Sequence, residues 1–243
     1  MQLIGLGMLV VVVAYGFTER QMSQISAFDM HALVVVLFGS MAAVITSSSA
    51  RTTLRTLGCL RELLPFGNTL GPKTKRLEAE RVELTALWRD GKRAQAVALA
   101  ENSTLAPIRK MLDLVLARAS PKATDTVFLE LRHAALGRWQ PATSNWELLS
   151  KLGPSFGMVG TITGMIQLFR NMGDDNLNIG AAMSLALVAT LYGVAFGAGV
   201  AGPIGHYLRG LLDERLGVLD RCRQSVLELV DSSRGESRMG QRG

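Results

Sequence analysis

The sequence predicts an all-α integral membrane protein with four transmembrane helices and a helical cytoplasmic domain inserted between the second and the third. The 243 residues are 48% hydrophobic, and this hydrophobic content is concentrated in four long runs. None of the runs contains an acidic residue, a lysine or an arginine, and charged stretches separate them. A soluble domain of this size usually has shorter apolar runs interleaved with polar positions, so the clustering favours a membrane protein.

The first two runs predict an N-terminal transmembrane hairpin over residues 1–46, with helices at 3–17 and 30–46. A helix needs about 17 to 25 residues to cross the hydrocarbon layer, so the first run is the weaker of the two. A cleaved secretory signal is the alternative for it. However, Met1-Gln2 supplies no basic residue and Ala14-Tyr15-Gly16-Phe17 is a poor cleavage site, so we expect a membrane span.

The distribution of basic residues predicts the orientation in the bacterial inner membrane. Residues 47–150 contain 16 basic and 10 acidic residues, whereas 18–29 and 170–180 each contain one basic and two acidic residues. Because basic segments are retained in the cytoplasm, we expect the middle segment and both termini to be cytoplasmic. The net charge of +6 is spread over these flanks without aromatic interleaving, so nucleic-acid binding is not expected.

The cytoplasmic domain, 47–150, is predicted to be helical. Apolar residues recur at helical spacing in three stretches, with breaks at Asp90-Gly91 and Ser120-Pro121. Apolar residues from Leu208 to Leu229 also recur at three and four, which predicts a cytoplasmic helical extension over 205–231. Residues 232–243 are rich in glycine, serine and arginine, which predicts a disordered tail. Two cysteines fall on the cytoplasmic side, so we expect free thiols at Cys59 and Cys222.

The second transmembrane hairpin, 151–204, is predicted to contain helices at 152–169 and 177–204, and it differs from the first in its small residues. Lipid gives helices no hydrophobic reason to associate, so faces of small residues indicate close backbone contact. Packing within one chain and packing between subunits of a ring would both use such faces. The glycines on the two faces are Gly153, Gly157, Gly160, Gly164, Gly193 and Gly197.

Four residues of this hairpin are candidates for a mechanism. Thr161 and Thr190 lie on or beside the small-residue faces and are candidates for lining an ion path, although a membrane threonine often bonds only its own helix. Pro154 and Pro203 each remove one helical hydrogen bond near the cytoplasmic side. They are candidates for a hinge, although prolines are common near helix ends.

The sequence offers little for catalysis, cofactors or metal binding. The glycine-containing stretch at 67–74 is one residue short of a phosphate loop, and Pro72 lacks the amide needed there. The three histidines have no metal-ligand spacing, so we expect no enzyme activity, no cofactor and no metal site. A proton relay needs a titratable group within the membrane, and the predicted spans contain no acidic or basic residue apart from His31 at an edge. Any proton-carrying carboxylate must therefore come from another chain.

The stretch from Leu152 to Leu208 resembles the pore helices of the MotA/TolQ/ExbB family, and most of all MotA- and PomA-type flagellar stator subunits. The resemblance lies in P-x-x-G-x-x-G-T-x-x-G, in NMGDD, and in ALVATLYG followed by GPI. It implies a homopentamer around a dimer of a single-span MotB-like protein whose aspartate carries the ion. Thr161 and Thr190 would then face that aspartate, and Pro154 and Pro203 would couple its charge state to movement of the cytoplasmic domain.

The resemblance implies flagellar torque generation but leaves the load and the ion open. Arg89 is the best counterpart of a basic rotor-contacting residue, whereas only Glu101 stands near the position of the family's acidic cluster. A TolQ- or ExbB-like role in energising the outer membrane is therefore an alternative, and a secondary transporter is a more remote one. The transported ion is H+ or Na+.

Overall fold

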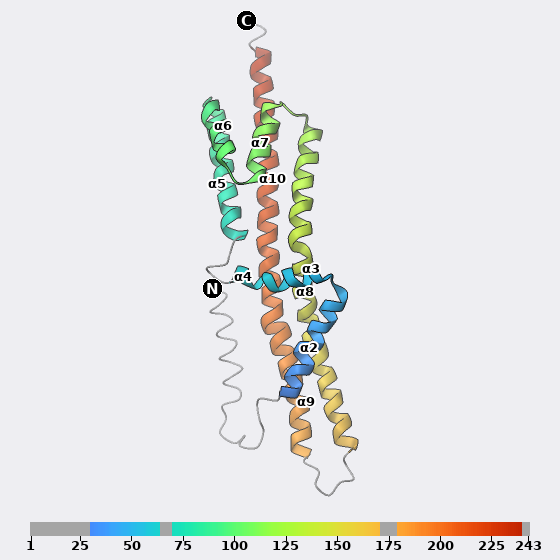
Figure 1. Ribbon diagram of the computed structural model, residues 1–243. Coiled ribbons are helices and arrows are strands. Elements are labelled where there is room, and N and C mark those ends of the chain that lie inside the picture. Colours follow the sequence, from blue (N-terminus) through green and yellow to red (C-terminus); the bar gives the residue numbers. More distant parts are fainter. Residues whose placement is uncertain (1–29, 64–69, 171–178, 240–243) are drawn as a thin grey trace. The chain divides into compact units, whose positions relative to one another are not determined.

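The computed structural model describes residues 30–63, 70–170 and 179–239, and every regular element in these ranges is a helix (Figure 1). The predicted all-α class is therefore confirmed for the described residues. The predicted first span, 3–17, and the NMGDD loop lie outside them. The elements are α2 (Met30–Ser47), α3 (Ala50–Gly58), α4 (Leu60–Leu63), α5 (Leu70–Arg89), α6 (Arg93–Asn102), α7 (Ala106–Leu116), α8 (Pro121–Arg170), α9 (Ile179–Val194), the π-helix η1 (Ala195–Ala201) and α10 (Gly202–Met239).

The chain divides into two compact units. The first unit contains residues 1–63 and 141–208, and the second contains residues 64–140 and 209–243. Helices α8 and α10 each contribute to both units, because the divisions after residues 140 and 208 fall inside them.

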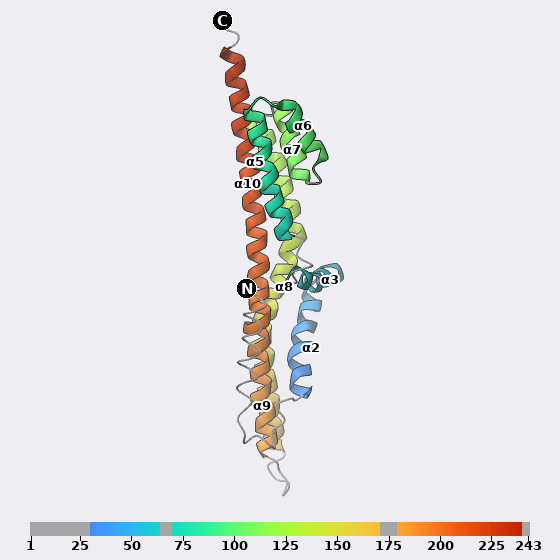
Figure 2. The ribbon, with the colours of Figure 1, turned by 90° about the vertical axis from the view of Figure 1, so that its left-hand side faces the viewer.

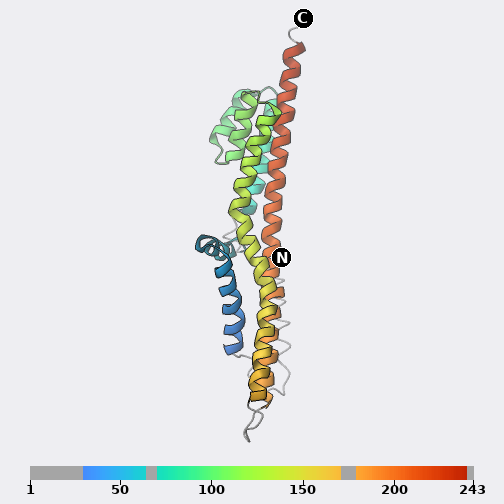
Figure 3. The same cartoon turned by 90° about the vertical axis from the view of Figure 1, so that its right-hand side faces the viewer.

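In the first unit, α2 packs through one narrow stripe. Ala32, Val36, Ser40 and Val44 are four residues apart and buried, as expected for one face of a helix. Ala32 packs in a small cluster with Val188 and Ala189 of α9. On an adjacent side, Gly39 lies close to the ring of Phe156 in α8, and Figure 3 shows α2 running beside this part of α8.

Helices α3 and α4 follow α2 and run across its direction in Figure 1. The Ser49 side chain caps α3 by accepting a hydrogen bond from the Thr52 amide at 3.4 Å. Thr56 connects α3 to α8, because its hydroxyl oxygen accepts from Asn145 Nδ2 at 2.8 Å and its carbonyl accepts from Trp146 Nε1 at 3.0 Å. These buried hydrogen bonds hold α3 against α8.

The second unit has a leucine-rich core formed by α5, α7, the first part of α8 and most of α10, and Figure 2 shows α5, α6 and α7 gathered together. The apolar stripes predicted from the sequence supply this core, which includes Leu77, Leu84, Ile108 and Met111, each fully buried. The predicted break after Arg89 is confirmed. Gly91 has φ +76°, a conformation that L-residues with a side chain rarely adopt.

The helices extend further than the sequence predicted. Helix α8 continues without interruption from Pro121 to Arg170, although Pro141 and Pro154 lie inside it. Residues 232–239, predicted to be disordered, form the last turns of α10 instead, as a continuation of the helix whose leucine face packs in the core. Residues 240–243 lie outside the described part of the chain.

Among the described residues, one helix, Ala186–Ser233, is long and apolar enough to cross a membrane, and Ala32–Ser47 is a shorter apolar helix. Residues 152–169, predicted as the third span, form the end of α8.

Candidate functional site

Glycines bring α8 and the helix formed by α9 and η1 into direct backbone contact. A methyl group placed on Gly153 would lie 2.7 Å from the carbonyl oxygen of Gly193 and 2.8 Å from Cα of Gly197. A methyl group on Gly193 would lie 2.5 Å from the carbonyl oxygen of Gly153. Such distances are shorter than real Cβ atoms make, so alanine does not fit at either position without movement of the backbone.

The contact continues along α8 by one further turn. A methyl group on Gly157 would lie 3.1 Å from the carbonyl oxygen of Ala189, and one on Gly160 would meet Cβ of Ala189 at 2.5 Å. Gly164, next on the same face, is also buried. The structure therefore brings the glycines of the two predicted faces to one crossing within the chain.

Thr161 and Thr190 meet at this crossing. Their hydroxyl groups form a short hydrogen bond with each other across the two helices. The Thr161 hydroxyl also lies 3.1 Å from the carbonyl oxygens of Gly157 and Ala186, and the Thr190 hydroxyl lies 3.3 Å from that of Ala186. Each hydroxyl has one proton, so these carbonyls are alternative acceptors. Both side chains are half-buried, and the pair forms a compact group of oxygen atoms between the two helices.

Pro154 lies at the tightest part of the crossing. The Cδ atom of its ring would be 2.5 Å from a methyl group placed on Gly197, so the ring occupies the space that the glycine leaves. Proline inside a helix removes a donor, and its ring crowds the carbonyl four residues earlier, here that of Ser150. That carbonyl oxygen would lie 2.7 Å from a methyl group placed on Gly197.

A π-helix replaces the α-helix just before Pro203. Residues Ala195–Ala201 are π-helical, and the Gly202 amide donates to the Gly197 carbonyl, five residues earlier. Single π-helical turns are frequent at functional sites. The sequence predicted a weak point at Pro203 but not this turn. The only signal was the run of small residues, which lets the backbone widen without losing side-chain packing.

The opposite side of the hairpin is apolar and exposed. Ile162 and Phe169 of α8 are each 60% exposed, and Leu187 of α9 is 67% exposed. Met158, Ile166 and Val194 lie on the same exposed surfaces. A water-soluble protein rarely leaves so many large apolar side chains uncovered, so these surfaces are suited to lipid or to other protein chains.

The two residues considered for rotor contact lie in the second unit. The Arg89 guanidinium, at the end of α5, forms an exposed ion pair with Glu228 of α10 at 2.8 Å. Glu101 is exposed near the end of α6. The structure thus gives Arg89 an acidic partner within its own chain, which the sequence pattern did not reveal because the two residues are far apart in sequence.

Both cysteines are free thiols, as predicted, and the structure shows that both are buried. Burial raises the pKa of Cys222 to about 12, with nearby Arg81 opposing the rise. Burial also raises the pKa of Cys59 to about 11, with Glu62 adding to it. Thiols with raised pKa values are poor nucleophiles at neutral pH, so both side chains are structural.

Comparison with known proteins relates this geometry to one family. Residues 99–220 match the model of the MotA/TolQ/ExbB proton channel family, a segment that includes all of α8, α9 and η1. The chain is 41% identical over 68 residues to Motility protein A of Aquifex aeolicus, which is 28% of this chain and 26% of that protein. It is 36% identical over 110 residues to Motility protein A of Cereibacter sphaeroides, or 45% of this chain and 39% of that protein.

A third relative is Chemotaxis protein PomA of Vibrio alginolyticus, 37% identical over 71 residues, which are 29% of this chain and 28% of PomA. The matches therefore span less than half the length of these relatives.

Two solved structures share the fold. The flagellar MotAB stator complex from Bacillus subtilis has a TM-score of 0.76 at 21% identity, covering 94% of this chain and 88% of that one. C. jejuni MotAB has a TM-score of 0.73 at 13% identity, covering 95% and 89%.

Proposed function

Because the chain belongs to the MotA/TolQ/ExbB proton channel family, a family of membrane proteins, we propose that it is a ring-forming subunit of an ion-driven stator. In this proposal it lines the ion path and converts ion flow into movement, with flagellar torque generation as the output. The family is one of channels and not of enzymes, which agrees with the absence of catalytic motifs in the sequence.

The observation that carries the proposal is the contact between Thr161 and Thr190. Two hydroxyl groups and the Ala186 carbonyl form a group of oxygens where Thr161 and Thr190 meet across the two predicted pore helices. An ion or a protonated carboxyl that leaves water needs such oxygens, because an unpaired polar group in hydrocarbon is costly. Both threonines are half-buried, so part of each residue is left uncovered within the single chain.

The ion-carrying group comes from a partner in this proposal. The predicted spans contain no aspartate, glutamate, lysine or arginine, so a carboxylate must be supplied by another chain. A homopentamer around a dimer of a single-span MotB-like protein provides it. The exposed apolar surfaces of α8 and α9 are suited to the contacts between neighbouring subunits and to lipid.

Movement is coupled through the region of the two prolines. The Pro154 ring packs on Gly197, inside the π-helical turn that precedes Pro203. Pro154 leaves α8 without one backbone hydrogen bond, and the π-helical turn lies beside it in the neighbouring helix. A change in the charge of the partner's carboxylate would shift the equilibrium between two arrangements of this turn, because a ligand moves a conformational equilibrium by its difference in affinity for the two states.

The remaining features of the proposal follow the charge pattern and the family. Four spans, at 3–17, 30–46, 152–169 and 177–204, place both termini and residues 47–150 in the cytoplasm of a bacterium, with the chain in the inner membrane. The ion is H+, the ion of the family description, and Na+ is the alternative because PomA is among the relatives.

A TolQ- or ExbB-like load is a second candidate, and one observation favours it. Arg89 is already paired with Glu228, and the sequence offers only Glu101 near the position of the family's acidic cluster. The pair is exposed, so it is weak and would not prevent Arg89 from exchanging partners.

The test uses isosteric removal of hydroxyl groups. Thr161→Val and Thr190→Val each remove one hydroxyl of the pair while keeping side-chain volume. Thr163→Val is the matched control, because Thr163 is on the same helix, is exposed and bonds only the Val159 carbonyl of its own turn at 2.9 Å. We expect the first two variants to lose ion-driven motility, with normal amounts of assembled complex, and the control to retain it. Equal motility in all three would contradict the role of the pair.

A further inference from the structure

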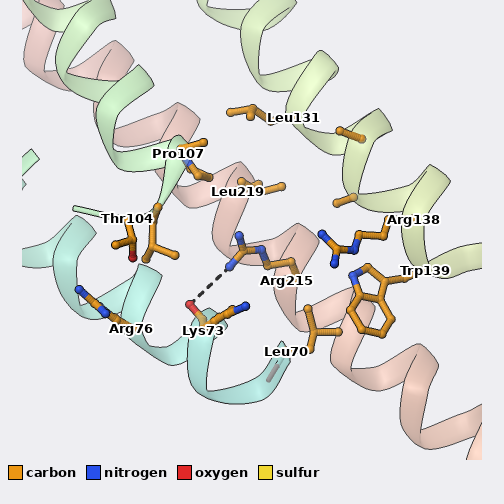
Figure 4. A pocket seen from close by; sticks show the side chains of 14 residues that line it. Leu70, Lys73, Arg76, Thr104, Pro107, Leu131, Arg138, Trp139, Arg215 and Leu219 are labelled. Carbon is orange, nitrogen blue, oxygen red and sulfur yellow. Dashed lines mark hydrogen bonds between the residues drawn. The ribbon is translucent and has the colours of Figure 1, made fainter. Parts of the chain in front are cut away.

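The second unit contains a cavity of about 520 Å³ that none of the proposed stator functions uses. It lies between the beginning of α5, the beginning of α7, the first half of α8 and the middle of α10. Figure 4 shows it from close by. A cavity of this volume is within the range of small-molecule sites, about 300–1,000 Å³.

The charge of the cavity is entirely positive. Lys73, Arg76, Arg138 and Arg215 line it, and no acidic residue is among its lining residues. Arg76 is neutralised by an ion pair with Glu80 at 2.6 Å. Within the described part of the chain, no carboxylate lies within ion-pair distance of the other three cations.

Several other arginines of the second unit, by contrast, form ion pairs with acidic residues. Arg81 pairs with Glu78, Arg132 with Asp220 and Arg223 with Asp125. Arg215, by contrast, is half-buried and donates only a long hydrogen bond of 3.4 Å to the Lys73 carbonyl. Burial lowers the pKa of Arg215, which reflects the cost of holding its charge away from water. An anion would offset that cost.

The walls also offer a flat apolar surface. Trp139 lies next to Arg138, whose guanidinium is 5.9 Å from the centre of the indole ring. Figure 4 shows Arg138 reaching from α8 toward Arg215, with the Trp139 ring beneath them in this view. Leu70, Leu131 and Leu219 are among the apolar residues of the lining. Aromatic side chains stack on the flat faces of bases, and arginine matches the geometry of phosphate.

We propose that this cavity binds a nucleotide carrying more than one phosphate, with the phosphates on Lys73, Arg138 and Arg215 and the base against Trp139. The inference does not depend on the proposed stator function. Three cations from three different helices match several phosphate groups better than a single charge. The N-terminus of α7, at Ala106 and Pro107, adds its positive dipole end to the same lining. A bound nucleotide would hold α5, α8 and α10 together.

The test measures binding to the full chain in detergent by calorimetry, with ATP in the absence of Mg2+ as the probe. Adenosine lacks the phosphates and pyrophosphate lacks the base, so we expect each to bind at least about tenfold more weakly than ATP. Arg138→Gln is expected to weaken ATP binding about tenfold, because it removes a charge-assisted contact. Arg109→Gln removes the same charge from an exposed position of α7 outside the cavity and should leave ATP binding unchanged.

Three results would overturn the proposal. The first is no saturable binding of ATP. The second is an equal effect of Arg138→Gln and Arg109→Gln, which would mean that only the general positive charge matters. The third is binding of dihexanoyl phosphatidylglycerol or of a pentaglutamate peptide as tightly as ATP, which would assign the cavity to a lipid headgroup or to an acidic protein segment.

Discussion

The two units of this chain pack their helices by different means. In the first unit, α8 and α9 approach each other through glycines, and the closest contacts join backbone atoms. In the second unit, leucine, isoleucine and methionine side chains fill the space between helices, and ion pairs lie on the outside. Burial of apolar surface drives association in water, whereas in lipid close packing must do so. The contrast therefore agrees with a membrane hairpin and a water-exposed domain in one chain.

The largest effect is expected in the core of the second unit. Leu84→Ala should lower the free energy of opening α5 and α7 by about 2–5 kcal/mol, because Leu84 is fully buried and its loss leaves a cavity. Val82→Ala on the same helix is the control. Val82 is 52% exposed, so we expect a change within about 0.5 kcal/mol. Amide hydrogen exchange in detergent measures both, and equal effects would mean that α5 does not pack as described.

The next largest effect is expected at the glycine crossing of the first unit, where a substitution adds a methyl group instead of removing side-chain atoms. Gly153→Ala should destabilise the α8 and α9 pair by about 1–3 kcal/mol, because the new methyl group meets backbone atoms of Gly193 and Gly197. Gly137 lies in the same helix, and a methyl group there meets nothing within 4 Å. Gly137→Ala should therefore stabilise the helix by up to about 1 kcal/mol. Opposite signs for the two substitutions, measured by thermal unfolding in detergent, are the expected outcome. Stabilisation by both substitutions would show that the gain in helix propensity outweighs the contact at Gly153.

The buried thiol of Cys222 should make stability depend on alkaline pH. Its pKa is about 12 in the folded protein, compared with 9.0 for an unperturbed thiol, so the folded state retains a proton that the unfolded state loses. The contribution of this thiol is therefore fully present below pH 9 and declines as the pH rises from 9 toward 12. The difference in unfolding free energy between the wild type and Cys222→Ala should shrink over that range. A constant difference between pH 7.5 and 11 would contradict the burial of this thiol.

The smallest effect is expected at the surface of the second unit. Arg89→Gln should change the unfolding free energy by only about 0–1 kcal/mol, because both partners of the Arg89–Glu228 pair are more than half exposed. Glu228→Gln should have the same small effect on stability. If Arg89 contacts a rotor, only Arg89→Gln should reduce swimming. A loss of swimming in both variants would instead indicate that the ion pair itself is required.

Sequence reasoning was most successful where periodicity was strong. The glycine spacing in 153–164 placed the small residues on one face, and the structure puts that face at a helix crossing. The leucine stripes of α5, α7 and α10 became the core of the second unit. Both patterns depend only on the 3.6-residue period of a helix, which is a local property.

The features that the sequence did not reveal depend on how distant segments meet. Thr161 and Thr190 were each expected beside a small-residue face, but their hydrogen bond depends on the register between two helices. The π-helical turn before Pro203 contains Gly197, which lies close to Pro154 and the Ser150 carbonyl of α8. The basic cavity combines cations from α5, α8 and α10. The length of α8 was also missed, because the sequence was divided at residue 150 into a cytoplasmic domain and a span, whereas the structure joins the two parts in one helix.

The most direct test of the central claim is the mass of the detergent-purified complex after co-expression with a single-span MotB-like protein, together with the number of copies of each chain. The proposed stator function predicts a pentamer of this chain around a dimer of the partner. A stable monomer, or a simple dimer that forms without any partner, would contradict it and would favour a transporter that works alone.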